Sequence, residues 1–199
     1  MIGYSQIGKS VPRIDAKEKA IGEAVYSSDI NLPGILFGKC KRSPHPFARI
    51  LSIDAGKALS LPGVKAVITA RNVTQSYFGE FFSDQVPLCD QYARYVGDEV
   101  AAVAAVDEDI AEEALDLIDV EYEILTPVFD PERAIEPEAP VVHPELTGAE
   151  QNIAMRIDFE RGEGEAAFKQ ADLVLEERFS TQPMHQCYMQ TRDCVVQWT

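Results

Sequence analysis

The residues best suited to chemistry lie near the C-terminus, in the segment 184–193 (MHQCYMQTRD). Its mixture of polar and soft side chains between two expected strands is typical of loops that line cofactor pockets, although an ordinary connection can have the same composition. His185 and Cys187 are a base and a nucleophile with one residue between them, so only a particular loop shape would bring them together. With Cys194 they supply three ligands, whereas a structural zinc site needs four. We therefore expect no independent catalytic group and no metal site in this sequence.

A glycine pattern at residues 162–167 formally matches the nucleotide-binding sequence Gly-x-Gly-x-x-Ala. In that motif a pyrophosphate lies at a helix N-terminus, and Glu163 and Glu165 would place carboxylates beside its phosphates. The expected helix is barely two turns long, and a complete βαβ unit has no room to follow. A plain turn from a strand into a helix is the favoured interpretation.

Two further segments combine cations with turn-forming residues. Residues 42–49 (RSPHPFAR) join two expected strands, and their prolines fix an extended path while Arg and His supply donors for backbone carbonyls or a ligand. Residues 94–99 (RYVGDE) precede a buried strand, where Gly97 permits a turn or bulge. A structural role accounts for both segments without a substrate.

The elements that position these segments repeat a pattern of strand, short helix and strand. In the first copy, residues 50–53 and 64–69 are the expected strands, and Asp54 caps a helix that ends at Leu59. Residues 34–42 supply a further strand ahead of this copy.

The second copy has the clearest local pattern. The apolar run 99–106 predicts a strand buried on both faces, and Asp107 is positioned to cap the helix that follows. The apolar face of that helix is formed by Ile110, Ala114 and Ile118. Alternating apolar and acidic residues at 120–124 predict a final strand with one face in water.

Three stretches depart from this pattern. Residues 75–91 carry aromatic side chains without a clean period and predict a long loop. Five prolines in residues 126–144 interrupt regular structure and mark a boundary. Beyond it we expect strands at 153–159, 173–179 and 194–198 and a helix at 165–170. These roughly fifty residues are too few for a robust separate core, so the second domain looks unfinished.

The composition predicts a folded protein with an acidic surface. A hydrophobic share of 46% over 199 residues is enough for a core. The formal charge of -15 repels phosphate backbones and anionic lipids, so nucleic acid and membrane partners are excluded. With no apolar run of about 18 residues and no secretion signal, we expect a cytoplasmic protein. Its four widely spread cysteines should be free thiols.

Taken in order, nine short segments resemble the large, molybdenum-binding subunit of the xanthine dehydrogenase and aldehyde oxidase family. The ordered set is fairly specific, although each segment is weak alone. The segments are 8–15 (GKSVPRID), 19–26 (KAIGEAVY), 29–34 (DINLPG), 42–49, 61–64 (LPGV), 94–98, 99–105, 120–123 (VEYE) and 167–172 (AFKQAD).

This resemblance implies an α+β fold. It consists of an a/b hammerhead domain with mixed sheets and helices, followed by the start of an α+β molybdenum-cofactor-binding domain. The implied boundaries are an N-terminal arm at 1–18, the hammerhead domain at 19–126, a Pro-rich linker at 127–150 and an incomplete first molybdopterin-binding domain at 151–199.

The same resemblance implies the N-terminal portion of a molybdenum hydroxylase large subunit. Such an enzyme hydroxylates an aldehyde, a purine or an N-heterocycle and passes electrons to iron–sulfur (Fe-S) and flavin (FAD) partners. The molybdenum-pterin cofactor belongs to the complete enzyme and is not bound by this chain alone. The family's glycine-rich pterin loop and general-base glutamate are expected beyond Thr199, so no catalytic residue is assigned here.

Three residues are candidates for contact with the cofactor, namely Tyr188, Gln190 and Arg192. The family segment that residues 188–191 resemble usually has glutamate where this chain has Gln190. Compared with a carboxylate, an amide has no charge, keeps an acceptor and adds donors. The difference therefore either changes the substrate range or shows that the position has only a structural role. Gly164 also replaces a common apolar residue, which weakens the start of the helix.

A second hypothesis comes from a different class of protein. Because no complete catalytic site is present, the chain could be a non-catalytic assembly or binding module with the hammerhead fold. Under either hypothesis the isolated chain should show no dehydrogenase activity.

Overall fold

The computed structural model describes residues 6–79, 83–146, 151–189 and 192–198. The chain divides into two units. One is the continuous segment Gly34–Val174, and the other combines the terminal segments Met1–Pro33 and Leu175–Thr199.

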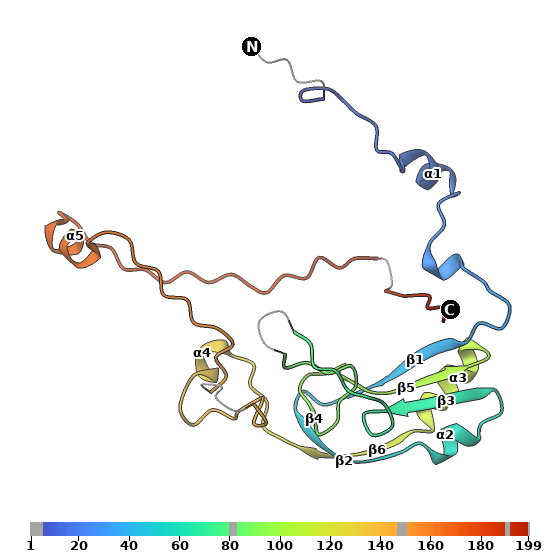
Figure 1. Ribbon diagram of the computed structural model, residues 1–199. Helices are drawn as coiled ribbons and strands as arrows, with labels where there is room; N and C mark the ends of the chain where they lie inside the picture. The colour runs from blue at the N-terminus through green and yellow to red at the C-terminus, as the bar shows by residue number, and fades with distance from the viewer. Residues whose placement is uncertain (1–5, 80–82, 147–150, 190–191, 199) are drawn as a thin grey trace. The chain divides into compact units, whose positions relative to one another are not determined.

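The unit Gly34–Val174 is built on two three-stranded sheets (Figure 1). The strand order is β1–β5–β3 in the first sheet and β4–β2–β6 in the second. The strands are β1 (Phe37–Arg42), β2 (Ala48–Asp54), β3 (Val64–Thr69), β4 (Tyr92–Ala93), β5 (Glu99–Ala105) and β6 (Asp119–Ile124). Every strand pair among the described residues is antiparallel. Together with the helices, these sheets confirm the α+β class.

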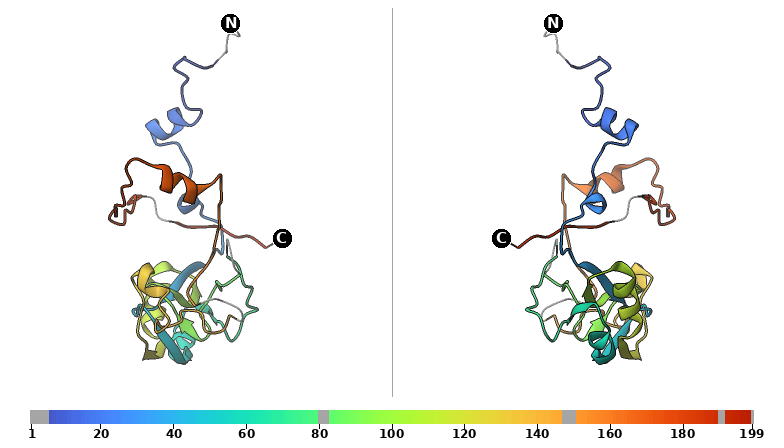
Figure 2. Two further views of the ribbon diagram at one scale, coloured as in Figure 1. Left: turned by 90° about the vertical axis from the view of Figure 1, so that its left-hand side faces the viewer. Right: turned by 90° about the vertical axis from the view of Figure 1, so that its right-hand side faces the viewer.

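The two predicted copies of strand, helix and strand interlock. β2, α2 (Gly56–Ser60) and β3 form the first copy, and β5, α3 (Glu108–Asp116) and β6 form the second. Because β2 pairs with β6 and β3 pairs with β5, each sheet takes one strand from each copy. Figure 2 shows these strands and helices gathered in one body from both sides. Neither copy can complete a sheet alone.

The starts of the two helices differ. The Asp107 carboxylate accepts hydrogen bonds from the second and third N–H groups that follow it, at 2.8 and 3.4 Å, and so caps α3 as predicted. The predicted cap of α2 is wrong by one residue, because β2 extends through Asp54 and Ala55 precedes the helix. Asp54 still accepts a hydrogen bond from the Gly56 N–H at 2.9 Å.

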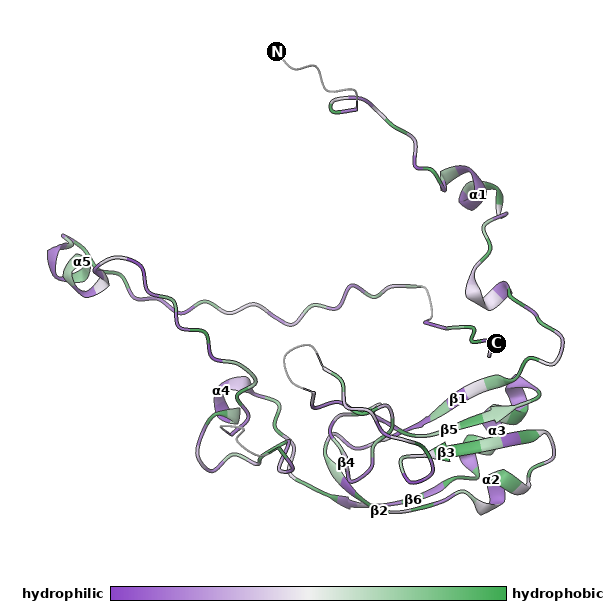
Figure 3. Cartoon of the chain, in the orientation of Figure 1, coloured by the Kyte–Doolittle hydropathy of each residue, from purple (hydrophilic) through white to green (hydrophobic). Residues whose placement is uncertain are grey.

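Small side chains let α3 lie close to the first sheet. Ala111 and Ala114 of the helix are completely buried in one cluster with the β5 residues Ala101, Val103 and Ala105. Ile118, just beyond α3, is the largest fully buried side chain in this cluster. Val100 points to the other face of β5 and joins a second cluster. β5 is therefore buried on both faces, as predicted, and it is hydrophobic over most of its length (Figure 3).

Gly63 makes the turn into β3 possible. Its φ angle of +99° lies in the left-handed region, and a Cβ at this position would lie 2.8 Å from Cδ1 of Ile110. Any other residue would strain the backbone and push against α3.

The Pro-rich stretch after β6 is a structured loop. It begins with a one-turn helix, α4 (Pro131–Ala134), whose proline occupies the first position, where no helical N–H bond is lost. The Asn152 side chain closes the loop by donating to the carbonyls of Ala134 (2.9 Å) and Pro140 (3.0 Å) and accepting from the Val142 N–H (2.8 Å). The prolines interrupt regular structure, but side-chain hydrogen bonds hold the segment together.

The C-terminal part contains the predicted helix, α5 (Gly164–Gln170), but none of the predicted strands. Residues 153–159, 173–179 and 194–198 run extended without strand pairing among the described residues. Their apolar side chains are open to solvent, with Ile157, Phe179 and Trp198 at 78%, 89% and 97% exposure. An alternating sequence supplies the face of a strand, but a strand also needs a partner for its backbone N–H and C=O groups.

The terminal segments form the second unit. Its helix α1 (Ala16–Ile21) ends at Gly22 and is followed by a short 3-10 turn, Ser27–Asp29. The Ser27 hydroxyl donates to the Asp193 carboxylate at 2.8 Å and so links the two segments. In the described part of the chain, no helix has the length and apolar character that crossing a bilayer requires.

Candidate functional site

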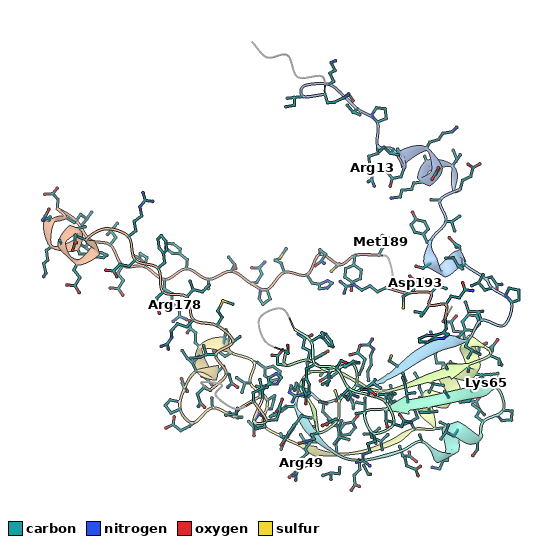
Figure 4. The ribbon with its side chains drawn as sticks, in the orientation of Figure 1. Arg13, Arg49, Lys65, Arg178, Met189 and Asp193 are labelled. Carbon is teal, nitrogen blue, oxygen red and sulfur yellow. The ribbon has the colours of Figure 1, made fainter. Side chains whose placement is uncertain are left out.

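Two of the three candidate cofactor residues lie side by side. The Arg192 guanidinium stacks on the Tyr188 ring, 5.1 Å from its centroid, and the His185 ring approaches the same tyrosine at 5.5 Å. Gln190 lies outside the described residues. The neighbouring Met189 is almost fully exposed on an extended segment (Figure 4). The pair presents a cation and an aromatic ring on an open surface.

His185 does not act on the Cys187 thiol. Its Nδ1 accepts a hydrogen bond from the Cys187 backbone N–H at 3.0 Å, which occupies the ring nitrogen that faces this residue. The thiol itself contacts the His185 carbonyl at 3.4 Å. Within the described residues, no group of three His, Cys, Asp or Glu side chains is placed to hold a metal ion.

The glycine pattern at 162–167 lacks the setting of a nucleotide site. Gly162 has a φ of +74° and makes a turn, and α5 has only seven residues. The preceding segment is unpaired rather than a strand of a sheet. A turn into a helix is what the structure contains.

The segments 42–49 and 94–99 are joined by a compact set of hydrogen bonds. The Ser43 N–H donates to the Asp98 carbonyl and the Gly97 N–H donates to the Ser43 carbonyl, both at 2.8 Å. The Arg42 guanidinium donates to the Gly97 carbonyl at 2.7 Å and pairs with Glu99 at 2.7 Å. These bonds hold the turn at 94–98 firmly against the end of β1.

The His45 side chain is part of the packing in this region. Its ring meets the Tyr122 ring edge-on, with 5.0 Å between the centroids. The neighbouring Phe47 is buried and stacks on Tyr92 at 6.0 Å. The segment 42–49 therefore fastens the two sheets, in agreement with the structural role favoured by its sequence.

Asp98 organises the inner side of the turn. Its carboxylate accepts the Arg94 N–H at 2.8 Å, and the buried Cys89 thiol lies beside it. Burial raises the pKa of the Cys89 thiol, and the Asp98 charge raises it further. Burial and the nearby carboxylates, Asp98 first, raise the pKa of Tyr95 to about 12. Neither group is a nucleophile or a base at neutral pH.

A network of charged side chains connects this turn to the Pro-rich loop. The Arg94 guanidinium binds the Glu145 carboxylate at 2.6 Å and the Val142 carbonyl at 3.2 Å. The His143 ring lies 3.0 Å from Glu145 and 3.8 Å from Asp84. Sequence reasoning missed this network, because Glu145 and His143 carry no local pattern that distinguishes them from other polar linker residues.

Opposing effects act on the Glu145 carboxyl. Burial raises its pKa, but a backbone hydrogen bond, the hydrogen bond from His143 and the Arg94 charge outweigh burial, so the net shift is downward. The charged form is the one that the network stabilises.

The network borders a cleft of about 770 Å³. Its apolar wall is formed by Phe78, Val86, Pro87, Tyr95 and Val142. Its polar lining includes Asp84, Gln85, Cys89, Arg94, Asp98, Glu99 and His143. The cleft lies wholly within the unit Gly34–Val174, far along the sequence from the candidates Tyr188 and Arg192.

The inert character of Cys89 can be tested by alkylation. At pH 8, iodoacetamide should modify the exposed Cys187 and Cys194 and leave Cys89 unmodified until urea unfolds the chain. Mass spectrometry of the labelled peptides over time measures the three rates. Alkylation of Cys89 in the folded chain at the rate of the exposed thiols would contradict the buried, high-pKa environment.

Comparison with known families and proteins identifies the family to which this fold belongs. The family described as "Aldehyde oxidase and xanthine dehydrogenase, a/b hammerhead domain" matches residues 21–126, which is more than half of the chain. The family described as "Molybdopterin cofactor-binding domain" matches residues 142–199. The two matches occur in the order that the resemblance implied.

Individual proteins similar to this chain agree with the two family matches. The chain is 41% identical over 185 residues to a probable xanthine dehydrogenase subunit of Bacillus subtilis, covering 92% of this chain and 24% of that protein. It is 38% identical over 179 residues to the "Nicotinate dehydrogenase large molybdopterin subunit" of Eubacterium barkeri, covering 89% and 41%.

Among solved structures, a Cu,Mo-CO dehydrogenase in its carbon monoxide-reduced state superposes with a TM-score of 0.71 and 35% identity, over 83% of this chain and 23% of that one. The chain thus spans between about a quarter and two fifths of the length of these proteins. On the strength of its fold and these matches, the chain belongs to the aldehyde oxidase and xanthine dehydrogenase family and contains its a/b hammerhead domain.

Proposed function

We propose that this chain is the N-terminal portion of the molybdopterin-binding large subunit of a molybdenum hydroxylase. The observation that carries the proposal is the succession of a hammerhead domain and a molybdopterin-binding segment in one polypeptide. The reaction is hydroxylation of an aldehyde, a purine or an N-heterocycle. In this proposal the chain supports the reaction as a scaffold, and the rest of the enzyme completes the catalytic site.

The proposed division of the chain follows the resemblance. Residues 1–18 are an arm, 19–126 the hammerhead domain, 127–150 the linker and 151–199 the beginning of the first molybdopterin-binding domain. The hydrogen bonds of Asn152 and the Arg94–Glu145 pair support one amendment to this division. The linker acts as a folded extension of the hammerhead domain rather than as a flexible tether.

We propose that parts of the enzyme outside the described residues complete the holder for the molybdenum-pterin cofactor. A holder requires several donors that converge on one site, whereas the side chains around Tyr188 are open to solvent. Tyr188 and Arg192 fit a contributing role, because a stacked ring and guanidinium can contact a flat, anionic group. We assign Tyr188 and Arg192 that role, and Gln190 stays a candidate from its sequence alone.

The proposed partners are an Fe-S subunit or domain and an FAD subunit or domain, which receive the electrons. Both relatives described above are named as subunits, which supports an assembly of several polypeptides. The proposed location is the cytoplasm. It is supported by the four cysteines, which are all free in the structure, as is usual for proteins of reducing compartments.

The decisive experiment is expression of the full-length gene together with its neighbouring genes. We expect stoichiometric molybdenum in the purified particle and dye-linked oxidation of at least one aldehyde, purine or N-heterocycle. Growth on tungstate in place of molybdate should abolish the activity. The 199-residue chain alone is the control and should be inactive. A stable particle without molybdenum or turnover would favour the non-catalytic module instead.

One variant in the same particle tests the proposed cofactor contact. Arg192→Ala should lower the pterin content, because it removes the cation of the stacked pair. Arg161→Ala is the matched control, since Arg161 is another exposed arginine of the proposed domain 151–199. Equal pterin content in both variants would remove Arg192 from the site.

A further inference from the structure

The cleft beside the 94–98 turn has more acidic than basic side chains. Three carboxylates, those of Asp84, Asp98 and Glu99, line it together with the single guanidinium of Arg94. Arg94 is neutralised by Glu145, and Glu99 is neutralised by Arg42 from outside the cleft. Among the described residues, neither Asp84 nor Asp98 pairs with a lysine or arginine. The cleft therefore retains two carboxylates without a lysine or arginine partner, of which Asp84 faces the His143 ring at 3.8 Å.

The rim of the cleft is rigid and apolar. Hydrogen bonds fix the turn at both ends, through Asp98 to the Arg94 N–H and through Ser43 to the Gly97 N–H. The turn nevertheless exposes Tyr95 by 55% and Val96 by 64%. Large apolar side chains on a preorganised backbone lose little entropy on binding, and tyrosine is a frequent anchor of interfaces. Carboxylates behind such an anchor favour a cationic occupant.

The Pro-rich loop passes along this cleft. Val142 and His143 belong to its lining, so the chain borders the cleft where the molybdopterin-binding match begins, at residue 142. The relatives named above are between about two and four times as long as this chain. In a subunit of that length, the polypeptide outside residues 1–199 is long enough to pack against the surface that contains this cleft.

We propose that the cleft receives a lysine- or arginine-bearing segment of the remainder of the same subunit. The Tyr95–Val96 tip anchors the apolar part of this segment, and its cation lies near Asp84 and Asp98. The contact locks the hammerhead domain to the cofactor-binding part of the enzyme. This inference rests on the proposed function, since it requires the full-length molybdenum subunit.

Photo-crosslinking in the assembled holoenzyme identifies the occupant. Replacing Tyr95 with p-benzoylphenylalanine and irradiating should join this position to a peptide of the same polypeptide outside residues 1–199. Mass spectrometry reads the linked peptide and whether lysine or arginine lies within it. Links only to another subunit, to a second copy of the chain, or to residues 1–199 would each overturn the proposal.

A charge-reversal pair tests the electrostatic part. With the crosslinker at Tyr95, Asp84→Lys should lower the yield of the linked peptide about tenfold, because it places a cation beside a cation. Glu113→Lys makes the same change of charge on the exposed side of α3 and should leave the yield unchanged. Asp84→Asn, a milder change, should give an intermediate yield. Equal yields in all variants would contradict the proposal.

The molybdenum content of the same preparations distinguishes a failure of the proposed function from a failure of the inference about the cleft. A particle that lacks molybdenum would refute the proposed function, whatever the crosslinks show. A molybdenum-loaded, active particle without the expected crosslink would refute only the inference about the cleft.

Discussion

Replacing Ile118 with alanine is expected to lower the free energy of unfolding by about 3 kcal/mol, within the range observed for large-to-small changes in protein cores. Ile118 is the largest fully buried side chain in the cluster between α3 and the first sheet. The other buried members of this cluster are mostly alanines, which have no rotamers with which to fill the space left behind. The cavity should therefore persist, and its cost adds to the lost transfer free energy.

The matched control is Ile124→Ala at the end of β6. Ile124 is 68% exposed, so the same deletion of three carbons should cost less than about 1 kcal/mol. Urea unfolding followed by far-ultraviolet circular dichroism measures both variants. Tryptophan fluorescence is a poor probe, since the single Trp198 is exposed in the terminal segment. Similar losses at the two positions would contradict the assigned core.

Local sequence patterns predicted the second strand–helix–strand copy well. The apolar run of β5, the Asp107 cap and the alternation in β6 are each determined by neighbouring residues. A strand buried on both faces, a capped helix and a half-exposed strand leave different periodicities in the sequence. For this reason the existence and type of these elements could be predicted.

Strand partners could not be predicted in the same way. β2 pairs with β6, and 65 or more residues separate their paired positions, such as Asp54 with Asp119. Such a choice depends on how the two copies interlock, and no local period encodes it. The unpaired segments at 153–159 and 173–179 show the converse, because their alternation is correct for a strand but no partner is present among the described residues.

The candidate site was predicted only in part. The composition of 184–193 and the family resemblance singled out Tyr188, Gln190 and Arg192. The structure brings Tyr188 and Arg192 together, but their contact with a cofactor remains a proposal. The acidic cleft was not predicted, because its lining comes from the long loop, the 94–98 turn and the Pro-rich loop. Only the fold brings these three stretches to one place.

Replacing Arg94 with methionine should detach the Pro-rich loop and lower the free energy of unfolding by about 2–4 kcal/mol, the range for breaking a largely buried ion pair. The Arg94 side chain is 15% exposed and that of Glu145 is 26% exposed. Methionine preserves most of the volume, but the Glu145 carboxylate and the Val142 carbonyl each lose a donor. Increased hydrogen exchange at residues 142–146 should accompany the loss of stability.

Arg49→Met is the control for this prediction. Arg49 also pairs with a glutamate, Glu123, but both side chains are about half exposed and Arg49 lies at the outer surface of β2 (Figure 4). Water screens such a pair, so its loss should cost less than about 1 kcal/mol. If both arginine variants lost the same stability, the distinction between the buried and the exposed pair would be wrong.

The pH dependence gives an independent test of the Arg94–Glu145 pair. Because the folded-state pKa of Glu145 is lowered, its contribution to stability is present above the unfolded-state pKa and is lost as the pH falls through the folded-state pKa. The difference in unfolding free energy between the unmodified chain and Arg94→Met should therefore be largest near neutral pH and shrink in acid. Urea titrations at several pH values measure this difference. A difference that stays constant through the acid range would mean that Arg94 stabilises the loop through packing and carbonyl contacts, without a contribution from the charge of Glu145.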